Sequence, residues 1–237
     1  MSWNERTELL LGSEKIKKLT NSHVLVTGLG GVGGYAAEQL ARAGVGKLTL
    51  VDSDIINETN INRQIIALQN NIGELKTSEF QKRLSLINPD INIEPITEFL
   101  KDEKIEEVLL KHKYDYVIDA IDTLSPKINF IQVCYENKIP FVSSLGAGGR
   151  IDPLKITIAD ISKTYNCNLA KILRKRLHRL GIRKGFKAVF SYEKIDKNAV
   201  IEEESMNKKS NVGTIGYIPA IFGNICAAVV IRELAEK

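Results

Sequence analysis

Runs of apolar, β-branched residues alternate with amphipathic stretches along this chain, and the alternation predicts an α/β fold. Apolar runs at 23–27, 47–52 and 114–122 have the length and composition of buried parallel strands. A helical pattern over 35–43 separates the first two strands and stops at Gly44, which gives a βαβ unit. We therefore expect a Rossmann-like, doubly wound sheet that is mostly parallel.

The rest of the chain extends this pattern without an internal repeat or a linker. Further strands are expected at 91–93, 139–143 and 188–192, and further helices at 104–112 and 126–137. Residues 155–158 begin an antiparallel continuation of the sheet, 196–212 form a polar, mobile loop, and a last helix follows Pro219. We expect one domain over 1–237, in which residues of about 160–212 insert a basic helix and this loop.

A glycine-rich turn joins the first strand to the first helix of the βαβ unit. Its glycines are Gly28, Gly30, Gly31 and Gly33. Without Cβ atoms such a turn lets backbone N–H groups approach phosphates, and the helix that follows adds its positive N-terminus. Asp52 ends the second strand about 20 residues later, where a carboxylate can bind ribose hydroxyls. The pattern does not choose among NAD, FAD and ATP, and a turn that only packs helix on strand remains the alternative.

Charged and amide side chains beyond Asp52 favour ATP. They are Asp54, Asn60, Arg63, Gln64 and Lys76. Adenylation builds negative charge on the α-phosphate and on pyrophosphate, and Arg63 and Lys76 are suited to stabilise that charge as catalytic groups. The alternative is that both are solvated charges on a surface helix.

The strand at 114–122 ends in two carboxylates, Asp119 and Asp122. Ligands of open α/β sheets bind at the carboxyl ends of the strands. Because Mg²⁺ is typically held by one or two carboxylates and phosphate oxygens, Asp122 is the predicted metal ligand and a third catalytic residue. The alternative is that Asp122 caps the helix that begins near Pro126.

These motifs together resemble the ubiquitin-activating-enzyme-like adenylyltransferases, which include the activators of sulfur-carrier proteins. The matching segments are Gly28-x-Gly30-Gly31-Val32-Gly33, Asp52-x-Asp54, Asn60-x-x-Arg63-Gln64, Lys76 and Asp119-x-x-Asp122. The resemblance implies that ATP and Mg²⁺ bind at these residues. It also implies a homodimer in which Arg6 reaches the phosphates of the partner subunit, although a solvated N-terminal arginine has the same pattern.

Within that family the chain is most similar to the branch that dehydrates threonylcarbamoyladenosine in tRNA. The segments that carry this likeness are 6–12, 117–122, 137–142 and 146–153. The resemblance implies that a carboxylate beside the anticodon is adenylated and then captured within the same modification. The tRNA anticodon stem-loop is then a partner, and whether a sulfur-transfer protein also binds stays open.

The positive charge of the chain is concentrated in one stretch. Residues 171–187 hold eight Lys and Arg and no acid, whereas the rest of the chain has 25 basic and 29 acidic residues. An apolar stripe at helical spacing runs through this region and consists of Leu169, Ile172, Leu173, Leu177 and Leu180. The stretch has three interpretations: a solvated face, a membrane surface and a nucleic-acid contact. Beside a nucleotide-activating site, tRNA is the polyanion we expect here. The predicted tRNA-binding residues are Lys171, Arg174, Lys175, Arg176, Arg179, Arg183, Lys184 and Lys187.

Cysteine content and hydropathy narrow the class of protein. The three cysteines form no Cys-x-x-Cys pair, which disfavours a disulfide framework and a structural zinc site. Cys167 is the most exposed-looking candidate to accept an acyl group, although a lone cysteine is more often inert. No apolar run approaches about 18 residues and no signal peptide is visible, so we expect a cytoplasmic protein without membrane insertion.

The resulting hypothesis is an ATP-dependent dehydratase of tRNA threonylcarbamoyladenosine. Three rivals remain at this point. An adenylyltransferase for a sulfur-carrier protein would share the ATP site, but it needs no basic stripe. An NAD-dependent dehydrogenase would have no use for Arg63. A nucleotide sensor would bind ATP without turning it over.

Overall fold

A seven-stranded sheet forms the centre of the computed structural model, which describes residues 3–195, 199–201 and 211–236. Its strands are β1 (His23–Thr27), β2 (Lys47–Val51), β3 (Asn92–Ile96), β4 (Tyr116–Asp119), β5 (Phe141–Ser144), β6 (Ile156–Asp160) and β7 (Lys187–Ser191). They lie in the order β3-β2-β1-β4-β5-β7-β6, and all neighbours pair in parallel except β6 with β7. The expected mostly parallel, doubly wound sheet with an antiparallel continuation is confirmed.

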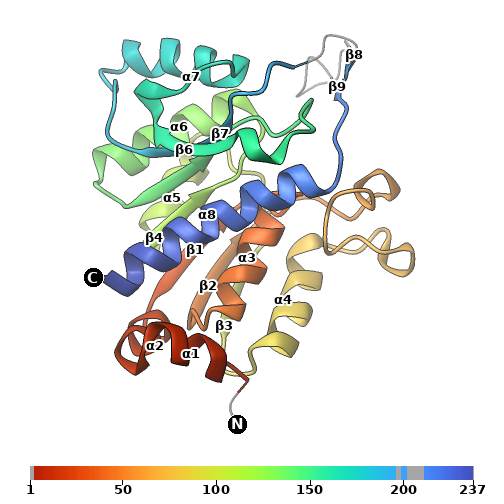
Figure 1. The fold of residues 1–237 in the computed structure, drawn as a ribbon, viewed down its shortest axis with the longest axis vertical. Helices are drawn as coiled ribbons and strands as arrows, with labels where there is room; N and C mark the ends of the chain where they lie inside the picture. Colours follow the sequence, from red (N-terminus) through yellow and green to blue (C-terminus); the bar gives the residue numbers. More distant parts are fainter. Residues whose placement is uncertain (1–2, 196–198, 202–210, 237) are drawn as a thin grey trace.

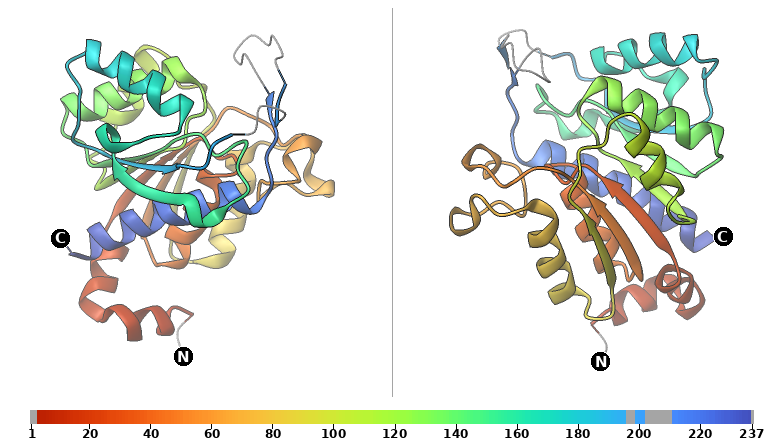
Figure 2. Two further views of the ribbon diagram at one scale, coloured as in Figure 1. Left: turned by 45° about the horizontal axis from the view of Figure 1, so that its top comes forward. Right: turned by 180° about the vertical axis from the view of Figure 1, so that it is seen from behind.

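Helices cover both faces of this sheet (Figure 1). They are α1 (Glu5–Leu11), α2 (Ser13–Thr20), α3 (Gly33–Arg42), α4 (Lys76–Ile87), α5 (Glu103–Leu110), α6 (Leu124–Glu136), α7 (Asn168–Arg179) and α8 (Tyr217–Glu236). One face carries α3, α4 and α8, and the other carries α5, α6 and α7. Seen from behind, α5 and α6 lie in front of the sheet (Figure 2).

The alternation of side chains along β1 explains the two cores. Val24 and Val26 belong to the apolar cluster under α3 and α8, whereas Leu25, between them, belongs to the cluster under α6 and α7. All three are completely buried. Successive strand residues point to opposite faces, so a continuous apolar run is the sequence of a strand covered on both sides.

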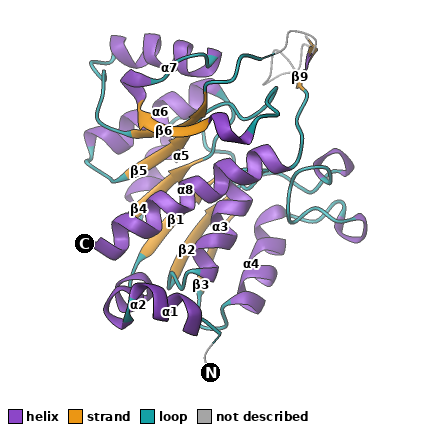
Figure 3. Ribbon diagram, in the orientation of Figure 1, coloured by secondary structure: helices purple, strands orange, loops and turns teal. Residues whose placement is uncertain are grey.

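The carboxyl ends of β1, β2, β4, β5 and β7 meet at one edge of the sheet, which we call the carboxyl edge. Chain connections diverge between β1 and β4, which makes the switch point at which open α/β sheets bind ligands. A long loop with two short 3-10 helices, Glu58–Asn60 and Gln69–Asn71, projects from this end of the molecule between β2 and α4 (Figure 3). The opposite, amino edge carries α1 and α2, since α2 leads into the start of β1.

Two expectations about the second half need correction. The strand predicted over 114–122 ends at Asp119, and the helix predicted from Pro126 begins at Leu124. The loop expected at 196–212 falls largely on residues outside the described ranges. The part that is described there includes a short antiparallel pair, β8 (Val200–Ile201) with β9 (Asn211–Val212).

The last helix, α8, is longer and more apolar than the sequence pattern suggested. By length and composition it could cross a membrane, with a mean hydropathy of 1.6 over an 18-residue window. The expectation that no apolar run approaches that length was therefore wrong. In the structure α8 packs against α3 and the sheet, and side chains such as Phe222 and Cys226 are completely buried. Burial in a core explains such a composition as well as a membrane does.

Candidate functional site

The glycine turn lies at the switch point, between the carboxyl ends of β1 and β4. Gly28 has φ +82°, and a Cβ there would come within 2.7 Å of the Ala120 carbonyl oxygen. A Cβ on Gly33 would lie 1.8 Å from the Gly28 carbonyl oxygen. Gly31 is restricted by Pro219, at 3.1 Å. Packing therefore accounts for these three glycines.

Gly30 is different, because none of the described residues packs so closely that this position must be glycine. The nearest atom to a Cβ at this position would be Gln64 Nε2, at an ordinary 3.7 Å. A glycine that packing does not require leaves its backbone accessible, and this lets a phosphate chain approach closely. Gly30 is thus the glycine that distinguishes a ligand cradle from a turn that only packs helix on strand.

The carboxylate of Asp52 holds the turn in place. Its Oδ2 accepts a hydrogen bond of 2.6 Å from the Leu29 N–H, and its Oδ1 accepts one of 2.8 Å from the Asp54 N–H. Burial raises the pKa of Asp52, while the charge of Lys76 and the two backbone donors act in the opposite direction. The acid at the end of β2 is therefore placed beside the glycine turn, as predicted.

Lys76 is the first residue of α4, and it is buried rather than solvated. Its Nζ lies 2.8 Å from Asp54 Oδ2 and 3.7 Å from Asp52 Oδ1. A lysine with a side chain only 5% exposed, held by two carboxylates, is not a random surface charge. The surface-helix alternative is therefore wrong for Lys76.

Arg63 and its neighbours lie in the loop between β2 and α4. Arg63 is half-buried, and its Nη1 donates to the Thr59 carbonyl oxygen at 2.7 Å and to Asn62 Oδ1 at 2.9 Å. Asn60 is buried, and its Oδ1 accepts from the Asn57 N–H at 3.2 Å. Gln64 is also buried, and its Oε1 has no hydrogen-bond partner among the described residues. Asn60, Arg63 and Gln64 thus lie together in one loop, and part of the hydrogen-bonding capacity of Gln64 is unused.

The two acids at the end of β4 and just after it have different environments. Asp119 is completely buried: its Oδ2 lies 2.8 Å from Lys127 Nζ and 2.6 Å from Ser143 Oγ, and its Oδ1 accepts from the Ile121 N–H. Lys127 Nζ also donates to the Ile121 carbonyl oxygen at 3.0 Å. Asp122 is exposed, and it precedes the N-cap residue Thr123.

This arrangement gives Asp119 and Asp122 separate tasks. Thr123, and not Asp122, occupies the N-cap position of α6, and the Thr123 side chain makes no capping hydrogen bond. The buried pair of Asp119 with Lys127 fixes the backbone at Ile121 on both its N–H and its carbonyl side, and so orients the adjacent Asp122. Sequence reasoning missed Lys127, which looks like any other helical lysine.

A second glycine-rich loop, Gly146–Arg150, follows β5 at the carboxyl edge. Its Gly149 N–H donates to the Gly213 carbonyl oxygen at 2.8 Å. The nearby Thr214 carbonyl oxygen accepts from Asn62 Nδ2 at 3.0 Å, so this loop, the start of the last segment and the Arg63 loop are connected. Arg150 is only 2% exposed. It also was not predicted as a site residue.

Helix α7 carries most of the predicted RNA-binding side chains. Its buried face is narrower than the apolar stripe in its sequence suggests. Ala170, Leu173 and Leu177 are buried, whereas Ile172 and Leu180, expected in the apolar stripe, are each 45% exposed. Two basic side chains contact protein groups: Arg174 donates to Thr164, and Lys187 pairs with Glu233. The other six predicted residues are exposed, namely Lys171, Lys175, Arg176, Arg179, Arg183 and Lys184.

Two further residues were predicted as candidates. Cys167 is the most exposed of the three cysteines, as expected, but it is only 5% exposed because packing at the start of α7 buries it. Arg6 is exposed on α1, at the amino edge, and the Asn4 beside it is close to Gly44 at the end of α3. Within one chain Arg6 is therefore remote from the glycine turn.

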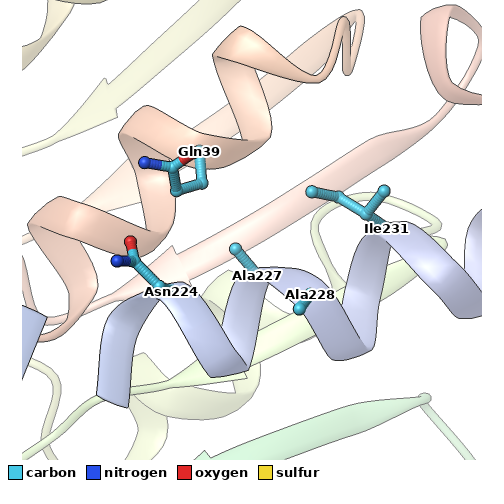
Figure 4. Close-up of a pocket in the computed structure, with 5 residues that line it drawn as sticks. All are labelled: Gln39, Asn224, Ala227, Ala228 and Ile231. Atoms are coloured by element: carbon cyan, nitrogen blue, oxygen red, sulfur yellow. The ribbon is translucent and has the colours of Figure 1, made fainter. Parts of the chain in front are cut away.

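Two hollows among the described residues lie away from the glycine turn. One, of about 330 Å³, lies between α3 and α8 and is lined by Gln39, Asn224 and three aliphatic side chains (Figure 4). The other, of about 750 Å³, opens at the amino edge, where its lining includes Phe141, Lys187 and Glu233. The first hollow offers no charged group to a phosphate or a metal ion, and the second lies at the opposite edge of the sheet from the glycine turn. The candidate site is therefore defined by the carboxyl-edge residues.

Three features together define a nucleotide-binding α/β protein. They are a doubly wound sheet with a glycine turn at its switch point, an acid and a lysine with buried side chains beside that turn, and an exposed acid after β4. The sequence model of the ThiF family matches residues 4–237. The chain belongs to the ThiF family.

Several members of this family have known activities or structures. The tRNA threonylcarbamoyladenosine dehydratase of Bacillus subtilis is 38% identical, over 98% of this chain and 94% of its own length. The crystal structure of E. coli tRNA N6-threonylcarbamoyladenosine dehydratase in complex with ATP superposes with a TM-score of 0.90 and 35% identity, covering 98% of this chain and 93% of that one. The molybdopterin-synthase adenylyltransferase of E. coli is 34% identical, but over 66% of this chain and 61% of its own length.

Proposed function

We propose that this protein is an ATP-dependent dehydratase of threonylcarbamoyladenosine in tRNA. The observation that carries the proposal is the joint presence of the nucleotide site at the switch point and of similarity to such dehydratases over nearly the whole chain. Similarity to the activators of sulfur carriers covers two thirds of the chain. That difference favours the dehydratase over an enzyme that activates a carrier protein.

The reaction requires little covalent chemistry from the protein. A carboxylate oxygen of the modification attacks the α-phosphate of ATP, and the bond from that phosphorus to pyrophosphate breaks. A neighbouring nucleophilic atom of the same modification then attacks the activated carboxyl carbon, and AMP leaves. The net change is the loss of one water molecule. The buried state of Cys134, Cys167 and Cys226 fits a mechanism without a cysteine nucleophile.

The site supplies orientation and charge. The glycine turn and the N-terminus of α3 would hold phosphates, and Asp52 would bind the ribose. Lys76 and Arg63 would stabilise the charge that builds on the α-phosphate and the leaving pyrophosphate. Lys76 already lies between two carboxylates, so it is held in position before the substrate binds.

Asp122 is the residue that we expect to hold Mg²⁺. The described residues contain no group of three or more His, Cys, Asp or Glu side chains that could hold a metal ion by themselves. A single exposed carboxylate at the carboxyl edge fits an ion that takes its other ligands from phosphates and water. When bound, Mg²⁺ would neutralise charge on the phosphates, while Asp119 and Lys127 keep the Asp122 backbone in place.

The exposed basic side chains of α7 offer a surface for tRNA that begins near the site. A Cβ on Gly146, after β5, would touch Leu169 at the start of α7, and the chain after α7 enters β7 at the amino edge. The helix is 12 residues long and therefore covers roughly 18 Å between the two edges. An anticodon loop at the carboxyl edge could extend its stem along these charges. The protein would then act in the cytoplasm, where it meets tRNA.

Arg6 and the exposed leucines beside it support a homodimer. Leu9 and Leu10 on α1 are 82% and 83% exposed, and apolar residues of the loop between β2 and α4, such as Leu68, are also exposed. Apolar side chains on two remote surfaces can cover one another when two copies meet. In such a dimer Arg6 could reach the partner's phosphates, which it cannot do within its own chain.

Mass spectrometry of tRNA nucleosides tests the proposed function. Purified protein, Mg·ATP and tRNA that carries threonylcarbamoyladenosine should yield a nucleoside lighter by one water molecule, together with AMP and pyrophosphate. Lys76→Ala should remove the activity. If ATP–pyrophosphate exchange is supported by a sulfur-carrier protein and not by the modified tRNA, the protein is a carrier-activating adenylyltransferase instead.

A further inference from the structure

The guanidinium of Arg150 is buried with part of its hydrogen-bonding capacity unused. Its Nη2 donates to the Asn166 carbonyl oxygen at 3.2 Å. Its Nε and Nη1 are shielded from solvent and have no hydrogen-bond partner among the described residues. Leaving buried donors of a charged group unpaired costs folding free energy. A protein keeps such a destabilising group where the group has a function other than stabilising the fold.

No carboxylate of the described residues neutralises this arginine as an ion pair. The carboxylate whose charge acts on it most directly, that of Glu193, uses Oε2 to accept the N–H groups of Ile151 and Asp152 at 3.1 and 3.0 Å. Burial has the largest effect on the pKa of Arg150 and lowers it, whereas Cys167 and Glu193 have smaller effects in the opposite direction. The environment of the guanidinium is therefore short of negative charge.

The strand order shows where this unpaired cation lies relative to the nucleotide site. Along the carboxyl edge the order is β2, β1, β4, β5 and β7. Asp52 follows β2, the glycine turn follows β1, Asp122 comes after β4, and Arg150 is on the loop after β5. The loop of Arg150 therefore lies beyond that of Asp122 along this edge, on the side away from Asp52. The acyl substrate must reach the α-phosphate from a side that the nucleoside does not occupy.

We propose that Arg150 binds the carboxylate of the acyl substrate and thereby distinguishes tRNA that carries the modification from tRNA that lacks it. This inference rests on the proposed function. Hydrogen bonds from a guanidinium to a carboxylate are short and strong because both groups are charged. The carboxylate would accept hydrogen bonds from the unpaired Nε or Nη1, and because these donors are shielded from solvent, the loop at Asn166 must move away from Arg150. One carboxylate oxygen is then held while the other attacks phosphorus.

Arg150→Met tests this inference by comparing two RNAs. Binding is measured without ATP, for tRNA bearing threonylcarbamoyladenosine and for the same tRNA with unmodified adenosine. The wild-type protein should prefer the modified tRNA by roughly tenfold or more, the loss expected for one charge-assisted hydrogen bond. Arg150→Met should bind both RNAs alike, with its affinity for Mg·ATP unchanged. Its KM for dehydration should rise by a similar factor.

Lys155→Met is the matched control. Lys155 follows the same loop, has a side chain that is 43% exposed and pairs with Asp152, so its loss removes one positive charge without touching Arg150. This variant should keep the wild-type preference. Arg150→Lys, which keeps the charge with fewer donors, should restore part of the preference. An Arg150→Met protein that loses affinity for both RNAs equally would show that Arg150 binds a backbone phosphate, and one that keeps the full preference would also overturn the inference.

Folding gives an independent criterion. Methionine fills a similar volume and removes the unpaired donors, so the free energy of unfolding of Arg150→Met should be equal to the wild-type value or higher. A structural role for Arg150 predicts a clear loss of stability, and that result would contradict the inference. If the wild-type protein does not dehydrate the modified tRNA, the proposed function itself fails, whatever Arg150→Met does.

Discussion

Replacing Gly30 by alanine is expected to weaken ATP binding without weakening the fold. Among the described residues the atom nearest to the new Cβ would be 3.7 Å away, which is ordinary van der Waals contact, and Gly30 does not have a positive φ. The free energy of unfolding should therefore change by less than about 0.5 kcal/mol. A phosphate against the turn would instead meet the methyl group. Losing one charge-assisted hydrogen bond costs about 1.5–3 kcal/mol, so the Kd for Mg·ATP should rise at least about tenfold.

Gly33→Ala provides the contrast, because its Cβ would lie 1.8 Å from the Gly28 carbonyl oxygen. The turn must shift to accept it, with an expected loss of at least about 2 kcal/mol in the free energy of unfolding. Calorimetric titration of each variant with Mg·ATP and chemical unfolding of each apo protein separate the two effects. A Gly30→Ala protein that binds ATP like the wild type would refute the phosphate cradle and leave a turn that only packs helix on strand.

Three further predictions concern other parts of the molecule. Lys127→Met leaves the buried Asp119 without its cation, so it should lower the free energy of unfolding by about 3–5 kcal/mol in urea titrations; a near-neutral result would contradict the buried pair. Burial lowers the pKa of His23 from 6.5 to about 4, so the folded state binds fewer protons than the unfolded state and should lose stability as pH falls below 6.5. In His23→Asn the free energy of unfolding should therefore depend less on pH between pH 7 and 5. Reversing Lys175, Arg176 and Arg179 to Glu should weaken tRNA binding and reduce its logarithmic salt slope by about 0.7–0.9 per lost phosphate contact; an unchanged slope would assign these charges another role.

Local chemistry and chain order were enough to predict the half of the site nearest the nucleotide. The glycine turn and Asp52 directly follow strands, Asp122 comes three residues after one, and parallel strands bring their carboxyl ends to one edge whatever the details of packing. Lys76 was predicted as a residue, but its burial between Asp52 and Asp54 was not, since a sequence does not show which helical lysine faces inward.

The rest of the site depends on tertiary contacts that the periodicity of the sequence does not reveal. Lys127 meets Asp119 because the turn after β4 brings α6 back over the strand end. Cys167 is buried and Arg174 is held by Thr164 because α7 packs down at its first turn. A count of basic residues could not separate Arg174 and Lys187, which contact protein groups, from the six exposed side chains available to a polyanion. Burial and pairing are properties of the tertiary structure, and they decide which of several similar side chains is functional.

The order of groups along the carboxyl edge restricts how an RNA-linked substrate can approach. From β2 to β7 the edge presents Asp52, the glycine turn, Asp122 and Arg150, and the start of α7 touches the loop after β5. If ribose is bound at the β2 end, a carboxylate attached to RNA must enter from the β5 end, where the exposed cations of α7 begin. The same order makes the two functions of the edge separable: changes at Gly30 should act on ATP, and changes at Arg150 on the modification, because Asp122 lies between them.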